Sequence, residues 1–168
     1  MTEPKFIADA MLGSLARKLR VFGFDTEYFR GTSDHDLIAL ARRRGRLVLT
    51  SDRLLAKLAE GEGVVTLLVR GRTDGQRLQD VAVGAALVGV RLEQGPSRCA
   101  LCNGELAIST RESMRGILSD RVLARHRLFF SCVSCGHVYW RGGHWKKLRR
   151  LQGRLRPKES RRQHRGER

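Results

Sequence analysis

Hydrophobic residues in the first ninety positions alternate between short continuous runs and runs with helical spacing. The continuous runs, which predict four short strands, are residues 5–8, 26–29, 47–49 and 64–69. Between them, apolar side chains recur every three or four residues, which predicts four amphipathic helices. Their apolar positions are Leu12, Leu15, Ala16, Leu19 and Phe22; Leu37, Ile38 and Ala41; Leu54, Leu55 and Leu58; and Leu78, Val81, Ala82 and Ala85. Strands that alternate with helices predict an α/β fold with a doubly wound parallel sheet.

All four cysteines of the chain occur in two Cys-x-x-Cys pairs. The pairs are Cys99 with Cys102 and Cys132 with Cys135. Four thiolates in this spacing match a tetrahedral structural zinc site, with one ion per chain. Gly104 and Gly136 follow the pairs, and we expect each to provide a positive φ in its turn. Two disulfides or thioredoxin-like redox pairs are the alternatives, and the absence of a secretory pattern at the start of the chain argues against them.

The cysteines divide the chain into expected domains. Residues 1–92 are expected to form the α/β domain. Arg91–Arg98, which contains Gly95-Pro96, is expected to form the linker. Residues 97–150 are expected to form a zinc ribbon with a helical insertion between the two pairs. Residues 151–168 are expected to be a disordered basic tail.

Positive charge is concentrated near the end of the chain. The whole chain has a net charge of +16; residues 141–168 hold 12 Lys or Arg against 2 Glu, a net of +10, and residues 1–98 hold 16 against 12, a net of +4. This distribution favours a nucleic-acid partner. A merely solubilising tail, in which the excess of arginine is compositional, is the alternative. Acidic lipid is less favoured because the tail has no broad apolar face, and the absence of a long apolar run predicts a cytoplasmic protein that does not enter a membrane.

Three aspartates fall where predicted strands end or helices begin. Asp9 follows the first strand, Asp34 begins the second helix, and Asp52 follows the third strand. The carboxyl ends of parallel strands lie at one edge of the sheet, so we expect these carboxylates to converge there. Such a group holds hard divalent cations, Mg²⁺ or Mn²⁺, which catalyse phosphodiester hydrolysis. Asp36 is a weaker fourth candidate, and the alternative role of each acid is a helix cap or the end of a strand.

Several other chemistries are excluded by their missing residues. A phosphoaspartyl phosphatase needs a second acid two positions after Asp9, where the chain has Met11. A receiver domain needs an acidic pair at the first strand and a lysine after a later one. The sequence also lacks a glycine-rich phosphate loop, a Gly-x-Ser-x-Gly elbow and a Cys–His nucleophile pattern.

Three segments together resemble one known family. They are Phe6-Ile-Ala-Asp9-Ala-Met-Leu-Gly13-Ser-Leu-Ala-Arg17-Lys-Leu-Arg20; Ser33-Asp34 with Gly45-Arg46-Leu-Val-Leu-Thr50-Ser-Asp52; and the cysteine pairs followed by Tyr139-Trp140-Arg-Gly-Gly-His144-Trp145. The chain resembles, over residues 5–150, the PIN-like ribonuclease domain with a C-terminal zinc ribbon, named after the carboxyl-terminal region of the Mut-seven exonucleases.

The resemblance implies a PIN-type α/β/α sandwich and metal-dependent hydrolysis of RNA. It implies catalytic and Mg²⁺- or Mn²⁺-binding roles for Asp9, Asp34 and Asp52, and zinc-binding roles for the four cysteines. A fourth acid found in many PIN-type nucleases has no clear counterpart, because Arg53 follows Asp52.

The expected partner is single-stranded RNA, with transfer RNA, ribosomal RNA and the ribosome as candidates. Basic and aromatic residues that we expect to contact it are Arg17, Arg20, Arg53, Trp145, Lys146 and Lys147. For the arginines, the alternative is a solvated helix face. The rival class of function is a non-catalytic RNA- or ribosome-binding zinc-ribbon protein that retains a vestigial nuclease site.

Overall fold

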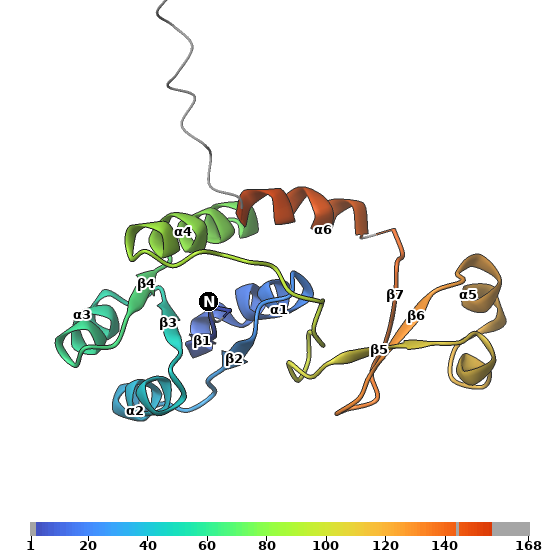
Figure 1. Cartoon of the computed structure of the whole chain (residues 1–168), viewed down its shortest axis with the longest axis horizontal. Coiled ribbons are helices and arrows are strands. Elements are labelled where there is room, and N and C mark those ends of the chain that lie inside the picture. Colours follow the sequence, from blue (N-terminus) through green and yellow to red (C-terminus); the bar gives the residue numbers. More distant parts are fainter. Residues whose placement is uncertain (1–2, 144, 156–168) are drawn as a thin grey trace, which may run out of the picture.

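The computed structural model describes residues 3–143 and 145–155 of the chain (Figure 1). An α/β domain is followed by a small three-stranded ribbon, and the last helix returns from the ribbon to the α/β domain. None of the described helices is long and apolar enough to cross a membrane.

Strands and helices alternate through the first domain as the sequence predicts. The elements are β1 (Phe6–Ala8), η1 (Ala10–Leu12), α1 (Gly13–Val21), β2 (Thr26–Tyr28), α2 (Asp34–Arg44), β3 (Leu47–Thr50), α3 (Arg53–Gly61), β4 (Thr66–Leu68) and α4 (Asp74–Leu87). The four strands pair in parallel in the order β2-β1-β3-β4. The predicted α/β fold with a parallel sheet is confirmed.

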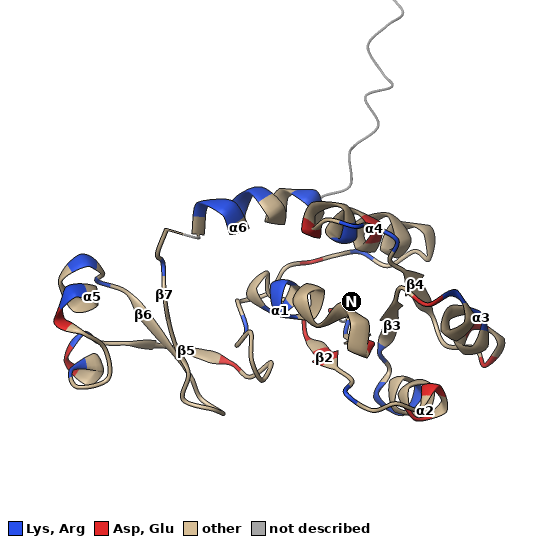
Figure 2. Cartoon of the chain, turned by 180° about the vertical axis from the view of Figure 1, so that it is seen from behind, with Lys and Arg blue, Asp and Glu red and all other residues tan. Residues whose placement is uncertain are grey.

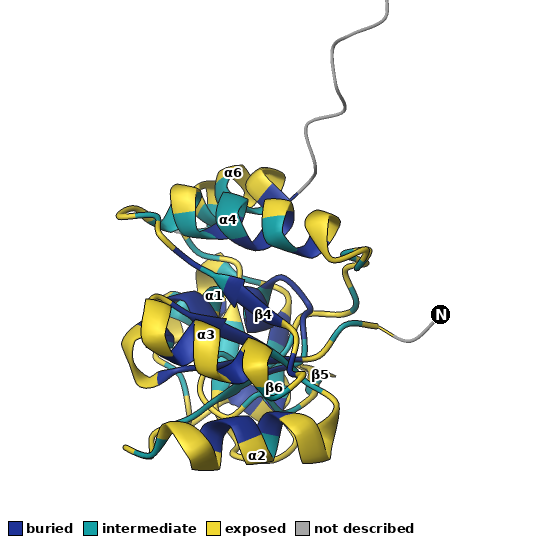
Figure 3. Ribbon diagram, turned by 90° about the vertical axis from the view of Figure 1, so that its left-hand side faces the viewer, coloured by how far each residue is buried: buried dark blue, intermediate teal, exposed yellow. Residues whose placement is uncertain are grey.

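Helices cover both faces of the sheet. Successive residues of a strand point to opposite faces, so apolar strand residues need a covering layer on each side. Phe6 and Ala8 of β1 pack into the core that contains the apolar faces of α1 and α4. Ile7, between them, packs into a second core with residues of α2 and α3. Figure 3 shows the buried residues of these helices on the sides that face the sheet. The domain is therefore a three-layer sandwich.

The strand order places a topological switch point between β1 and β3. The chain runs from β1 to β2 on one side and then crosses to β3 on the other side of β1. In open parallel sheets, ligands bind at the carboxyl ends of the strands where the order reverses. Here those ends lead into Asp9 and Asp52.

The ribbon is an antiparallel sheet whose strands lead into and out of the cysteine pairs. It contains β5 (Leu106–Ser109), β6 (Phe129–Cys132) and β7 (Val138–Trp140) in the order β5-β6-β7. The insertion between β5 and β6 holds η2 (Glu112–Met114) and α5 (Asp120–Arg125). Its small core consists of Met114, Leu123 and Phe129.

The last helix does not belong to the ribbon. α6 (Trp145–Gln152) extends from the side of the ribbon to α4, and its last turn and η3 (Gly153–Leu155) contact α4 (Figure 1). Leu148 and Leu151 pack against the core of the α/β domain, and Leu155 is buried in it. Helical structure thus continues past residue 150, where we expected the ribbon to end and a disordered tail to begin. The remainder of the expected tail, residues 156–168, lies outside the described residues.

A buried arginine joins the ribbon to the α/β domain. Arg20, near the end of α1, donates through Nε to the carbonyl of Thr26 at 2.7 Å. Its Nη1 donates to the carbonyls of Ala100 and Leu101, both at 2.9 Å, within the first cysteine turn. Burial lowers the pKa of Arg20 from its ordinary value. The sheet and the first cysteine turn therefore share one guanidinium.

Candidate functional site

The four cysteine sulfurs lie together at the end of the ribbon. Cys99 Sγ is 3.6 Å from Cys135 Sγ, and Cys102 Sγ is 3.4 Å from Cys132 Sγ. All four sulfurs lie within 4.8 Å of one another. Four sulfurs about 2.3 Å from a tetrahedral zinc ion would be about 3.8 Å apart, so the arrangement fits such an ion.

The two cysteine turns close in different ways. Gly136 has a φ of 73°, as expected, but in the first turn it is Asn103 that has a positive φ, of 70°. Our expectation that Gly104 provides it is wrong. A Cβ at Gly104 would lie 2.6 Å from Ser134 Oγ and 3.0 Å from Cys132 Sγ, so this glycine allows the two turns to pack closely. Asn103 tolerates the left-handed region better than most residues do.

Asp9 is held at the switch point by two hydrogen bonds. Its carboxylate accepts from the backbone N–H of Met11 at 2.8 Å and from the hydroxyl of Thr50. Its own N–H donates to the carbonyl of Leu49 at 3.0 Å, which continues the pairing of β1 with β3. The residue is only 6% exposed, so the carboxylate has little freedom to move.

Asp52 is joined to Asp9 through Thr50. The backbone N–H of Asp52 donates to Thr50 Oγ1 at 2.9 Å, and Thr50 itself is fully buried. One oxygen of the Asp52 carboxylate caps α3 by accepting from the N–H groups of Leu54 at 2.7 Å and Leu55 at 3.3 Å. Thr50 therefore connects the ends of two adjacent strands, a role that the sequence analysis did not identify because Thr50 appeared there only as part of a quoted motif.

Asp34 and Asp36 lie in the first turn of α2, which follows β2. Both are exposed. Ser33 caps this helix by accepting from the Asp36 N–H at 3.2 Å, so neither aspartate serves as the N-cap. Both carboxylates remain available at the same edge of the sheet as Asp9.

The three predicted catalytic aspartates share one edge of the sheet, but they are not gathered tightly. Within residues 3–143 and 145–155, the cysteines are the only group of three or more potential ligands whose atoms all lie within 4.8 Å of one another. Asp9, Asp34 and Asp52 therefore lie at one edge of the sheet without forming a closed chelating group, and their shared cation site stays a prediction. Asp34 and Asp52 are exposed, whereas Asp9 is fixed.

The acidic edge carries no internal counter-ion in the part of the chain that the structure describes. None of Asp9, Asp34, Asp36 and Asp52 forms an ion pair with a described lysine, arginine or histidine. Asp74, by contrast, pairs with Lys18 at 3.0 Å. These carboxylates have no internal cationic partner among the described residues, although the chain has a net charge of +16. A bound metal cation could therefore neutralise them at this edge.

The residues expected to contact RNA divide into two groups. Arg20 is 6% exposed and bonded to three carbonyls, so its prediction as a phosphate contact is wrong. The other cationic candidates, Arg17, Arg53, Lys146 and Lys147, are exposed, and Trp145 is half-buried. His144, which belongs to the motif quoted above, lies outside the described residues.

The protein is a three-layer parallel α/β domain joined to a four-cysteine ribbon. Its acids lie at the switch point of the parallel sheet. The family model of the Mut7-C RNAse domain matches residues 4–152, so the chain belongs to this family. The comparison with curated proteins and the comparison with solved structures each gave no match. The predicted family is confirmed, and the family assignment supports a nuclease-like function with RNA as the substrate.

Proposed function

We propose that the protein is a ribonuclease that hydrolyses phosphodiester bonds of single-stranded RNA with the help of Mg²⁺ or Mn²⁺. The observation that carries this proposal is the linkage of Asp9 and Asp52 through Thr50 at the switch point. A ribonuclease family and an acidic edge at the position where parallel sheets bind ligands support the same chemistry.

Asp9, Asp34 and Asp52 would hold the divalent cation, with Asp36 close enough in sequence to assist. Oxygen ligands of this kind suit Mg²⁺ and Mn²⁺. Each oxygen of Asp9 accepts one hydrogen bond, and a carboxylate has about four lone-pair sites in all, so both retain capacity for a ligand. When bound, such a cation lowers the pKa of water and stabilises charge that develops at phosphorus.

The chain itself contributes positioning. Thr50 restrains the Asp9 carboxylate. The second oxygen of Asp52, which the cap of α3 leaves free, and rotation of the exposed Asp34 side chain would complete the ligand set. Arg17 on α1 and Arg53 at the start of α3 are exposed, and we assign them to the RNA backbone. Lys146 and Lys147 on α6 extend the cationic surface beyond the edge. In the ribbon, we propose that zinc is the ion held by the four cysteines and that it has a structural role.

A non-catalytic RNA-binding protein is the second candidate. Two observations favour it. The aspartates are not gathered within 4.8 Å of one another, and the residue after Asp52 is Arg53 instead of a further acid that could bind a cation. This candidate predicts RNA binding that responds to salt but produces no cleavage.

Cleavage of labelled single-stranded RNA by the zinc-loaded protein separates the two candidates. We expect cleavage with added Mn²⁺ or Mg²⁺, loss of cleavage without them, and at least a hundredfold loss in Asp9→Asn. Glu60→Gln, which removes an exposed charge on α3, is the matched control and should cleave normally. Cleavage by Asp9→Asn at the wild-type rate would remove this active-site assignment. Tight binding without cleavage by the wild type would establish the second candidate.

A further inference from the structure

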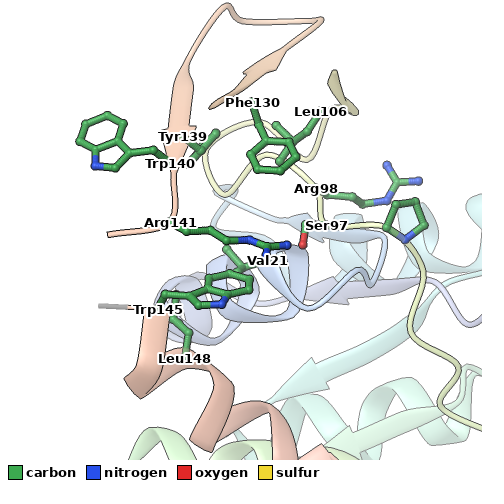
Figure 4. Close-up of a pocket in the computed structure, with 11 residues that line it drawn as sticks. Val21, Ser97, Arg98, Leu106, Phe130, Tyr139, Trp140, Arg141, Trp145 and Leu148 are labelled. Atoms are coloured by element: carbon green, nitrogen blue, oxygen red, sulfur yellow. The ribbon is translucent and has the colours of Figure 1, made fainter. Parts of the chain in front are cut away.

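A cavity opens where the α/β domain, the ribbon and α6 meet. It has a volume of about 330 Å³, and it is distinct from the acidic edge because Val21, at the end of α1 remote from Asp9, forms part of its wall. The linker contributes Ser97 and Arg98, the ribbon contributes Phe130 and Tyr139, and α6 contributes Trp145 (Figure 4).

Planar side chains dominate the inner surface. The guanidinium carbon of Arg141 lies 5.1 Å from the centre of the Trp145 ring, and the Phe130 and Tyr139 rings lie across the cavity (Figure 4). The Trp140 ring extends to the other side of β7 (Figure 4). Aromatic rings and arginine planes are the surfaces on which proteins stack unpaired bases of RNA.

The charge of the cavity suits a nucleotide. Arg98 and Arg141 contribute to its lining, and none of the described lining residues is acidic. Arg98 uses Nη1 to donate to the carbonyl of Asn103 at 3.0 Å, whereas Arg141 is exposed and forms no hydrogen bond with any described residue. An arginine stacked on one face and open to solvent at its edge can donate to a phosphate.

α6 connects this cavity with the side of the domain that carries the acids. The helix begins at Trp145, and Leu151 and Arg154 lie against Gly75 in the first turn of α4, which follows the carboxyl end of β4. At about 1.5 Å per residue, its eight residues span about 12 Å. Its exposed cations are Lys146, Lys147, Arg149 and Arg150, and Figure 2 shows this basic face along the helix.

We propose that the cavity binds one unpaired base of a single-stranded RNA, stacked on the Arg141–Trp145 pair, while the basic face of α6 guides the RNA backbone toward the acidic edge. This inference rests on the proposed function for its ligand class and adds a base-binding site that is separate from the site of hydrolysis. A duplex presents no unpaired base, so the site selects single-stranded segments.

Tryptophan fluorescence tests this directly because the chain has only two tryptophans, Trp140 and Trp145. Zinc-loaded full-length protein with Trp140→Phe retains Trp145 as its only tryptophan, and Asp52→Asn in the same chain prevents cleavage while keeping a good N-cap. We expect a saturating oligouridylate to quench Trp145 emission. An abasic ribose-phosphate oligomer of the same length should bind, as measured by anisotropy, without quenching.

Affinity measurements with variants provide the second readout. Trp145→Leu should weaken oligouridylate binding by about 5- to 100-fold without changing the salt dependence, whereas Trp145→Phe should bind nearly as well as the wild type. Arg141→Gln should weaken binding and lower the salt slope by about one. Arg43→Gln, at an exposed position on α2, is the control and should change neither.

Equal quenching by the abasic oligomer, or unchanged affinity in Trp145→Leu, would overturn the base-binding site. RNA binding without quenching would also overturn it and would leave the proposed hydrolysis untouched. Base-dependent quenching together with no cleavage by the wild type would reject the nuclease and retain the base-binding site.

Discussion

The hydroxyl of Thr50, at the end of β3, donates a hydrogen bond to the carboxylate of Asp9, which follows β1. The same hydroxyl accepts from the backbone N–H of Asp52 at 2.9 Å. One buried oxygen atom thus positions both acids that flank the switch point. A valine would suit the strand and the core equally well, so the hydroxyl has a role that packing does not explain.

Replacing Thr50 by valine should therefore weaken both stability and cleavage. The Thr50→Val protein leaves Asp9 and the Asp52 N–H without their shared partner, which we expect to cost about 1–3 kcal/mol of unfolding free energy. A displaced Asp9 carboxylate should lower the cleavage rate by about 10- to 100-fold. Urea denaturation and RNA cleavage measure the two effects. Thr50→Ser keeps the hydroxyl and is the control; if it cleaves as poorly as Thr50→Val, the hydroxyl does not position the acids.

Metal content tests the assignment of the cysteines. We expect about one zinc per chain by elemental analysis, and loss of that zinc in Cys102→Ser. Without the ion, the ribbon should unfold while the parallel sheet, which has its own core, retains slow hydrogen exchange. Intact disulfides, or protein purified without metal, would contradict the assignment.

Arg20 should couple the ribbon to the sheet. Arg20→Lys cannot donate to all three carbonyls that the guanidinium satisfies, so we expect a loss of about 1–3 kcal/mol of unfolding free energy. Hydrogen exchange should accelerate at Ala100 and Leu101 in particular. Arg17→Lys changes an exposed arginine on the same helix and should leave both quantities unchanged. Similar behaviour of the two variants would show that the buried hydrogen bonds contribute little.

Asp25 should make this junction sensitive to acid. Burial alone would raise its pKa, but hydrogen bonds from Arg46 and Asn103 outweigh burial and lower the pKa from its ordinary value of 3.8. Because the folded pKa lies below the unfolded one, the stabilisation is complete above the unfolded pKa and is lost as the pH falls through the folded pKa.

The comparison that isolates this effect is the unfolding free energy of the wild type minus that of Asp25→Asn. We expect this difference to stay constant above about pH 5 and to shrink below about pH 4. Both proteins carry the same cysteines, so acid release of metal affects them alike. A difference between the wild type and Asp25→Asn that does not change between about pH 5 and about pH 3 would contradict the role of Asp25.

Features that depend on local sequence were predictable here. Apolar periodicity predicted the alternation of strands and helices, and the spacing of the cysteines predicted their cluster, because neighbouring residues determine both. The position of Asp9 beside Thr50 follows from the parallel pairing of β1 with β3, so the acids could be assigned to one edge but their separation could not.

Features that depend on distant contacts were not predictable. Arg20 is a charged residue beside the apolar face of α1, and only the docking of residues 99–103 shows that its guanidinium is buried. Leu148, Leu151 and Leu155 form an apolar stripe near the end of the chain, but a stripe does not identify the surface that covers it. The role of Gly104 also depends on a distant contact, because the residue that lies close to it, Ser134, belongs to the second cysteine turn.

The most direct test of the central claim is a crystal of the zinc-loaded protein soaked in Mn²⁺ and measured at the manganese absorption edge. We predict an anomalous peak at the switch point, within bonding distance of the carboxylates of Asp9 and Asp52, and no such peak in Asp9→Asn crystals soaked in the same way. Fully occupied manganese elsewhere on the surface, with none at Asp9, would contradict the account.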